Sequence, residues 1–130
     1  MIVDSSALVA VLLREADHKR LVDALAGAPR VAVGGPTLAE TGMVLVSRLG
    51  IRGKTLLARL VQEAEIDVVP LGPGHWTVAV DAFAKYGKGR HPAALNFGDC
   101  LTYAIARVAA EPLLCVGDDF PQTDLELVDW

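Results

Sequence analysis

Acidic side chains stand where short apolar runs of this sequence end, or where apolar helical stretches begin. Asp4 follows "MIV", Glu40 lies early in "PTLAETGMVLVSRLG", and Asp99 lies early in "NFGDCLTYAIARVAA". Asp118 and Asp119 follow "PLLCVG". If such carboxylates meet, they repel each other unless they are protonated or bridged by a cation. Oxygen ligands favour Mg²⁺ or Mn²⁺ over Zn²⁺, so these residues suggest a site for a hard divalent cation.

Each acid also has a purely structural explanation. Asn96-x-x-Asp99 and Thr37-x-x-Glu40 both fit a capping box, in which an acid at the fourth position helps to start a helix. Asp4 can cap the helix that begins with the serines after it, and "GDD" can be an ordinary turn. Taken singly, capping explains each acid better than catalysis does. Only their convergence would favour a functional site.

The elements that must position these acids follow from hydrophobic patterning. Short apolar runs predict strands over residues 1–3, 30–35, 66–71, 112–117 and 125–129. Amphipathic stretches with Gly and Pro at their ends predict helices over residues 6–15, 17–27, 36–50, 51–64, 74–87 and 96–110. Residues 88–95 form a predicted loop and 118–124 a predicted turn. Strands that alternate with helices indicate an α/β domain, a three-layer sandwich with a mainly parallel sheet.

This order of elements brings the acids to one edge of the predicted sheet. A residue just past a parallel strand lies at the carboxyl edge, and the helix that leaves the strand starts there. The helix over 96–110 must run back to the base of the strand over 112–117, so its start, with Asp99, lies at the same edge. Open α/β sheets bind their ligands at this edge. A Mg²⁺ or Mn²⁺ ion there can generate hydroxide and stabilise charge on a phosphodiester.

Composition limits the class of protein. The chain has 130 residues and is 52% hydrophobic, which fits one globular domain. Its formal net charge of −4 argues against a protein that binds nucleic acid through its overall charge. Residues 43–62 and 84–92 are basic and free of acids, so they can hold a polyanion. No membrane span or signal peptide is evident, and Cys100 and Cys115 are expected to be buried free thiols, which fits the cytoplasm.

Four stretches of the sequence resemble a known family. They are "IVDSSAL", "LAE", "GKGRHPAALNFGDCLTYAIA" and "LLCVGDDFPQTDL", and together they resemble the PIN domain, most closely the VapC toxins of bacterial toxin–antitoxin pairs. The resemblance covers essentially the whole chain. It implies a single PIN-like α/β/α sandwich over residues 1–130, and a Mg²⁺- or Mn²⁺-dependent endoribonuclease acting on structured RNA, such as tRNA or rRNA.

The resemblance also carries residue roles and partners onto this chain. Asp4, Glu40 and Asp99 match the metal site, and Ser6 is expected to orient it by hydrogen bonding. The family often has a Thr in the stretch that here reads "CVGDDF", so the fourth acid is either Asp118 or Asp119. Asp118 is favoured, because Asp119 with the following Phe can anchor the turn. The family implies homodimers, and a cognate VapB-like antitoxin that neutralises the toxin in a heterotetramer or larger assembly.

Further residues have two interpretations each. Lys88, Arg90 and His91 can contact RNA phosphates near the cleavage site, or they can simply belong to an exposed loop. Asn96 is mainly a helix cap, although its amide could also reach a water on the metal. Asp124 is expected to cap the turn "PQTD".

Two other functions remain open at this point. One is a non-catalytic interaction module whose acidic groove binds a basic partner peptide, and partner binding without nuclease activity in any divalent metal would support it. The other is phosphoryl transfer through an aspartyl phosphate on Asp4. That reaction calls for a second acid beside the nucleophile and for a Lys at a strand end, and this sequence has neither arrangement.

Overall fold

Four short parallel strands form the centre of the molecule. A computed structural model describes residues 1–130, in the sheet order β3-β2-β1-β4. The strands are β1 (Ile2–Val3), β2 (Ala32–Gly34), β3 (Asp67–Val69) and β4 (Leu113–Leu114). Ile2 pairs with Ala32 on one side and with Leu113 on the other, so β1 lies inside the sheet with a neighbour at each flank. All three pairings are parallel, as the alternating pattern of elements predicts.

Alternate strand residues face two separate hydrophobic cores. Those that face one core are Ile2, Ala32, Leu113 and Cys115. Those that face the other are Val3, Val33 and Leu114. Successive side chains of a strand point to opposite faces of the sheet, and both faces of β1, β2 and β4 are covered, which explains why the residues of these three strands are apolar. The edge strand β3 is more exposed and begins with Asp67.

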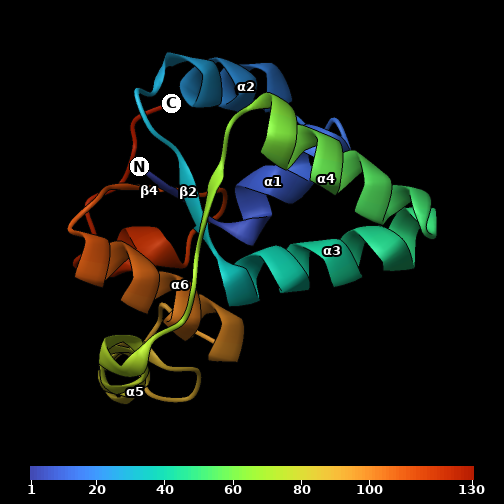
Figure 1. Ribbon diagram of the computed structural model, residues 1–130. Coiled ribbons are helices and arrows are strands. Elements are labelled where there is room, and N and C mark those ends of the chain that lie inside the picture. Colours follow the sequence, from blue (N-terminus) through green and yellow to red (C-terminus); the bar gives the residue numbers. More distant parts are fainter.

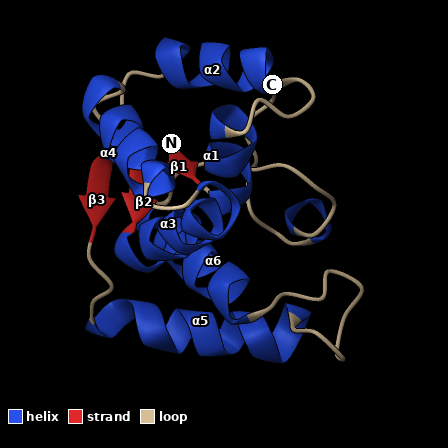
Figure 2. Cartoon of the chain, turned by 90° about the vertical axis from the view of Figure 1, so that its right-hand side faces the viewer, coloured by secondary structure: helices blue, strands red, loops and turns tan.

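Six helices cover the two faces of the sheet. The helices that build the core behind Val3 are α1 (Ser5–Leu12), α2 (His18–Gly27), α3 (Gly35–Leu49) and α4 (Arg52–Glu63). Those that build the core behind Ile2 are α5 (Pro73–Tyr86) and α6 (Phe97–Ala109). Figures 1 and 2 show the two groups on either side of the strands. The molecule is therefore the predicted α/β/α sandwich.

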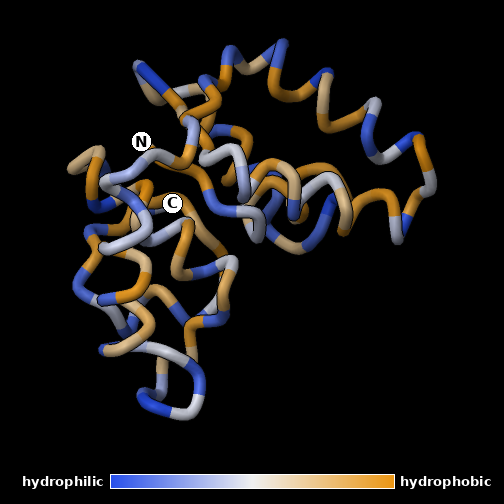
Figure 3. The backbone as a smooth tube through the Cα atoms, turned by 60° about the horizontal axis from the view of Figure 1, so that its bottom comes forward, coloured by the Kyte–Doolittle hydropathy of each residue, from blue (hydrophilic) through white to orange (hydrophobic).

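Helix boundaries follow from local signals. α3 has a Pro near its first position and ends at Gly50, whose φ of 69° favours glycine. Hydrophilic and hydrophobic residues alternate along the helical coils (Figure 3), as expected for helices that bury one face. No helix is both long and apolar enough to cross a membrane.

The structure corrects the sequence-based prediction at its C-terminal end. Residues 125–129 are not a strand, because they pair with β4 at a single bridge between Leu113 and Leu127. The ends of this segment are held by side-chain contacts: Asp124 contacts Tyr103, and the Trp130 indole donates to the carbonyl of Cys115. Between those anchors the segment meets β4 at one residue only.

A second correction concerns the start of α3. The capping box that the spacing of Thr37 and Glu40 offers as a structural explanation does not form, because α3 begins at Gly35, with Gly34 as its cap residue. Thr37 therefore lies inside the helix and is 3% exposed. Glu40 falls in the second turn rather than the first, and its carboxylate is free of a capping role.

Candidate functional site

Asp4 lies at the carboxyl end of β1 and is 4% exposed. Its Oδ2 caps α1 by accepting the backbone N–H of Ser6 at 3.0 Å, and it also accepts the Ser6 hydroxyl at 2.6 Å. The same hydroxyl oxygen accepts the backbone N–H of Val116 at 3.0 Å. Ser6 thus joins the end of β1 to the segment after β4. Both hydrogen bonds to Asp4 fall on one oxygen, which leaves Oδ1 without a protein donor.

Asp99 has two roles available to it because only one of its oxygens is used in capping. Oδ2 accepts the backbone N–H of Asn96 at 3.0 Å, and the Asn96 side chain accepts the backbone N–H of Asp99 at 2.9 Å. This is the capping box predicted from the sequence, and it starts α6. Oδ1 accepts no hydrogen bond from the protein, so the carboxylate can start a helix and still bind a cation.

Glu40 comes from α3 and lies against the first turn of α6. A side chain added at Gly98 would begin 2.3 Å from Glu40 Oε2, so the carboxylate fills the space beside this glycine. A buried hydroxyl pair holds the two helices together, since Thr37 Oγ1 lies 2.9 Å from Thr102 Oγ1. Thr37 is three residues before Glu40, and Thr102 is three residues after Asp99. The pair therefore fixes the part of α3 that carries Glu40 against the part of α6 that carries Asp99.

Of the two acids after β4, Asp119 is the one whose charge acts on Asp99. Repulsion from Asp119 contributes to the raised pKa of both Asp99 and Cys115, whereas Asp118 contributes to neither. The backbone carbonyl of Asp118 accepts the amide N–H of Gln122 at 3.0 Å. The sequence leaves Asp118 and Asp119 as alternatives and favours Asp118, whereas the charge that raises the pKa of Asp99 is that of Asp119.

The pKa of Asp99 is raised, in part by the charges of the other acids. Burial raises its pKa from 3.8 to about 6, the hydrogen bond from Asn96 opposes this rise, and the charges of Asp4, Asp119 and Glu40 add to it. Three segments far apart in sequence thus place negative charge around the carboxyl group of Asp99. No Lys or Arg forms an ion pair with any of these four acids.

The acids are grouped, but they are not arranged as a finished coordination shell. No three His, Cys, Asp or Glu side chains are placed so that together they could hold a metal ion. The donor set nevertheless fits a hard divalent cation, since it consists of carboxylate oxygens and includes the free Oδ1 atoms of Asp4 and Asp99. Direct ligation by three of them would require side-chain rotation.

The basic loop before α6 makes mostly local contacts. The Arg90 guanidinium lies over the Phe83 ring, 5.4 Å from its centroid. His91 Nδ1 accepts the backbone N–H of Ala93 at 3.0 Å, and its ring stands edge-on to Tyr86. Lys88 is exposed, and its backbone N–H donates to the carbonyl of Leu95 at 3.0 Å. None of the three basic side chains forms an ion pair or hydrogen bond with the acids.

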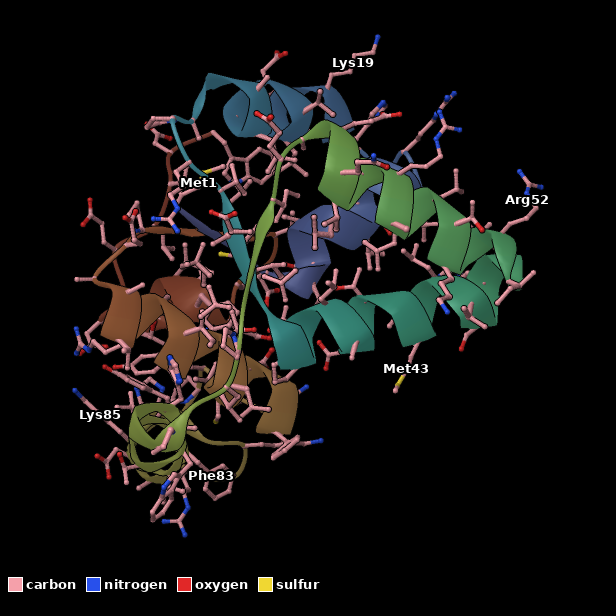
Figure 4. All side chains as sticks on the ribbon, in the orientation of Figure 1. Met1, Lys19, Met43, Arg52, Phe83 and Lys85 are labelled. Atoms are coloured by element: carbon pink, nitrogen blue, oxygen red, sulfur yellow. The ribbon has the colours of Figure 1, made fainter.

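An apolar groove lies apart from the acids. It has a volume of about 940 Å³ and runs between α3 and α4, with Leu38, Met43, Val46 and Leu57 in its lining and Lys54 also contributing. Met43 projects outward from α3 (Figure 4) and is 70% exposed. None of the candidate site residues lines this groove. Glu40 and the groove therefore belong to different parts of the surface of α3.

Sequence reasoning missed one polar cluster near the site. Asp124 does not cap its turn as predicted, because Thr123 does so by donating its hydroxyl to the carbonyl of Phe120 at 2.7 Å. Asp124 instead accepts hydrogen bonds from Tyr103 and Arg107 of α6. The signal was present, since a Tyr in a buried helix needs a partner for its hydroxyl and the acidic C-terminal stretch offers several.

Comparisons with known proteins show the family to which the chain is similar. The family model for the PIN domain matches residues 1–126. The ribonuclease VapC36 of Mycobacterium tuberculosis is 50% identical over 127 residues, which cover 97% of this chain and 91% of that protein.

Two solved structures share the fold. One is Mycobacterium tuberculosis VapC20, described as a sarcin–ricin loop cleaving toxin, with a TM-score of 0.79 and 21% identity over 98% of this chain and 97% of that one. The other is VapBC2 of Rickettsia felis, bound to a DNA fragment from its promoter, with a TM-score of 0.79 and 14% identity over 99% of this chain and 97% of that one.

Proposed function

Since this chain belongs to the PIN-domain family, and within it to the VapC ribonucleases, we propose that it is a metal-dependent endoribonuclease toxin controlled by a cognate antitoxin. One observation carries the proposal beyond family membership. The negative charges of Asp4, Glu40 and Asp119 all raise the pKa of Asp99, and no Lys or Arg forms an ion pair with any of these acids. Such a cluster is costly unless a cation binds it.

The residue roles follow from the hydrogen bonds. Asp4 and Asp99 are the principal ligands, each through the oxygen that capping leaves free. Glu40 and Asp119 complete the acidic pocket, directly or through water. Ser6 holds Asp4 in one orientation and ties it to the segment that carries Asp119. Asn96 acts as a cap that fixes Asp99 at the first turn of α6.

The cation in this proposal is Mg²⁺ or Mn²⁺, because the donors are carboxylate oxygens. When bound, it supplies an activated water and neutralises charge on the phosphodiester during displacement. The protein's own part is to bring four carboxylates to one region and to bind the rest of the RNA. Lys88, Arg90 and His91, on the loop that leads into Asn96, are the proposed phosphate contacts.

The proposed substrate is structured RNA, either tRNA or rRNA. The name of the VapC20 neighbour, a toxin that cleaves the sarcin–ricin loop, supports this class of substrate. The VapBC2 neighbour, solved with its promoter DNA, supports a VapB-like antitoxin as partner. We further propose that residues 1–130 act as one PIN-like domain, and that two copies associate in a homodimer that the antitoxin joins in a heterotetramer or larger assembly.

The decisive experiment compares RNA cleavage by four proteins. These are the unmodified chain, Asp4→Asn, Asp99→Ala and, as a matched control on exposed α2, Asp23→Asn. We expect cleavage by the unmodified chain and the control in Mg²⁺ or Mn²⁺, loss of cleavage in EDTA, and loss in both site variants with the fold retained. Sequencing of RNA ends after induced expression, with Asp99→Ala as background, identifies the target. Undiminished cleavage by Asp4→Asn would refute the site assignment.

A second candidate function is an interaction module without catalysis, and the apolar groove between α3 and α4 favours some partner binding. A toxin with an antitoxin would also bind a partner, so binding does not separate the two functions. Partner binding with no RNA cleavage in any divalent metal would support the module and refute the nuclease.

A further inference from the structure

The segment from Val116 to Asp124, which carries Asp119, is attached to the rest of the protein at both ends. At its start, the backbone N–H of Val116 donates to Ser6 Oγ at 3.0 Å. In its middle, Phe120 is 4% exposed and belongs to the hydrophobic core that α5 and α6 share. At its end, Asp124 contacts α6. The position of Asp119 therefore depends on these three attachments.

The attachment at Asp124 uses both oxygens of its carboxylate. The Tyr103 hydroxyl donates to Oδ1 at 2.6 Å, and the Arg107 guanidinium donates to Oδ2. Lys85 of α5 (Figure 4) adds its charge, with Nζ 3.9 Å from Oδ2. Hydrogen bonds between charged partners are stronger than neutral ones, so this clasp of Tyr103, Arg107 and Asp124 resists displacement.

The clasp is built on the helix that also carries Asp99. Asp99, Tyr103 and Arg107 are spaced four residues apart, so they lie along one side of α6. The middle of α6, from Cys100 to Ala106, is buried, which prevents the helix from turning about its axis. The distance along the helix from Asp99 to the clasp is therefore constant.

A short rigid path leads from the clasp back to Asp119. The residues between them form the 3₁₀ turn Phe120–Gln122. The turn is closed at its start by the Gln122 N–H donating to the Asp119 carbonyl at 3.2 Å, and at its end by the Thr123 N–H donating to the Phe120 carbonyl at 2.9 Å. A displacement of Asp124 would thus be transmitted to Asp119.

From these contacts we infer that Tyr103, Arg107 and Asp124 are positioning residues, which hold Asp119 toward Asp99 and thereby raise the affinity of the acidic site for its divalent cation. This inference rests on the proposed function. It predicts that loss of the clasp weakens cation binding without removing any ligand. A purely structural clasp would change stability alone.

The test uses Tyr103→Phe, which removes only one hydroxyl, and Asp124→Asn. The matched control is Asp67→Asn, which breaks the exposed ion pair between Asp67 of β3 and Arg30, two residues before β2. Two measurements are made: hydrogen–deuterium exchange of residues 117–123 in metal-free protein, and Mn²⁺ binding by titration calorimetry. Both clasp variants should exchange faster over 117–123 and bind Mn²⁺ about tenfold more weakly, whereas the control should match the unmodified chain.

The outcomes separate this inference from the proposed function. If the unmodified chain and Asp124→Asn bind Mn²⁺ equally well, the inference is overturned and the proposed function stands. Unchanged exchange over 117–123 in both clasp variants would also overturn it. If the unmodified chain binds no Mn²⁺ and cleaves no RNA, the proposed function fails and the inference fails with it.

Discussion

The carboxylate of Glu40 occupies the place where a side chain at Gly98 would begin. A Cβ at residue 98 would lie 2.3 Å from Glu40 Oε2 and 3.1 Å from its Cδ, far inside contact distance. Gly98 is the second residue of α6 and directly precedes Asp99. The absence of a side chain there is what allows an acid from α3 to approach the start of α6.

Gly98→Ala should therefore weaken Mn²⁺ binding without destabilising the fold. The conflicting atoms belong to the flexible end of Glu40, which can swing aside, and alanine favours helix over glycine by roughly 0.5–1 kcal/mol. We expect an unchanged or higher melting temperature, and about tenfold weaker Mn²⁺ binding by calorimetry. Gly74→Ala is the control, because Gly74 is the second residue of α5 and meets nothing within 4 Å. Mn²⁺ affinity equal to that of the unmodified chain would show that Glu40 need not lie there.

The buried pair of Thr37 and Thr102 should show strong coupling in a double-mutant cycle. Replacing either threonine by valine leaves the other hydroxyl buried without this partner, which costs about 1–3 kcal/mol of unfolding free energy. Replacing both removes the problem, so the double variant should lose less than the sum of the single losses. Urea unfolding measures all three. Additive losses would mean that the hydroxyls do not depend on each other.

The contribution of Asp124 to stability should depend on pH. Burial by itself raises the pKa of Asp124, but the hydrogen bond from Tyr103 and the charges of Arg107 and Lys85 outweigh it and hold the pKa below 3.8. A carboxyl with a lowered pKa stabilises the fold above its unfolded pKa, and this stabilisation is lost as pH falls through the folded pKa. Asp124→Asn should be less stable than the unmodified chain at about pH 7, and the difference should shrink below about pH 4. Urea unfolding across this range gives the measurement, and a constant difference would contradict the ion pairing.

Both thiols should be unreactive in the folded protein. Burial, together with the charges of Asp4 and Asp119, raises the pKa of Cys115 to about 12, and burial and the charge of Asp99 raise that of Cys100. Only the thiolate reacts, so labelling of Cys115 at neutral pH should be about a thousandfold slower than that of an ordinary thiol. Reaction with a disulfide reagent should give two thiols only after unfolding in guanidinium. Rapid native labelling would place a cysteine at the surface.

The sequence was sufficient where the determining contacts are local. The capping box of Asn96 and Asp99 spans four residues, and Gly50 ends α3 as predicted. The alternative explanation of Glu40 by a capping box with Thr37, which rests on the same kind of local spacing, is wrong. The hydroxyl of Thr37 instead forms a hydrogen bond with that of Thr102, which lies 65 residues away in sequence. A local motif and a distant partner competed for that hydroxyl, and the distant partner is visible only in the folded chain.

By itself, the sequence determined the alternation of strands and helices and the burial of the inner strands, because periodicity and chain order encode both. The same chain order predicts that the acids lie at one edge of the sheet. Only the tertiary structure decided that residues 125–129 form a single bridge with β4, that Thr37 pairs with Thr102, and that Asp124 is held by Tyr103. Those outcomes depend on how α6 packs between α3, α5 and the last segment. Contacts between residues far apart in sequence are set by the path of the whole backbone, which no short pattern contains.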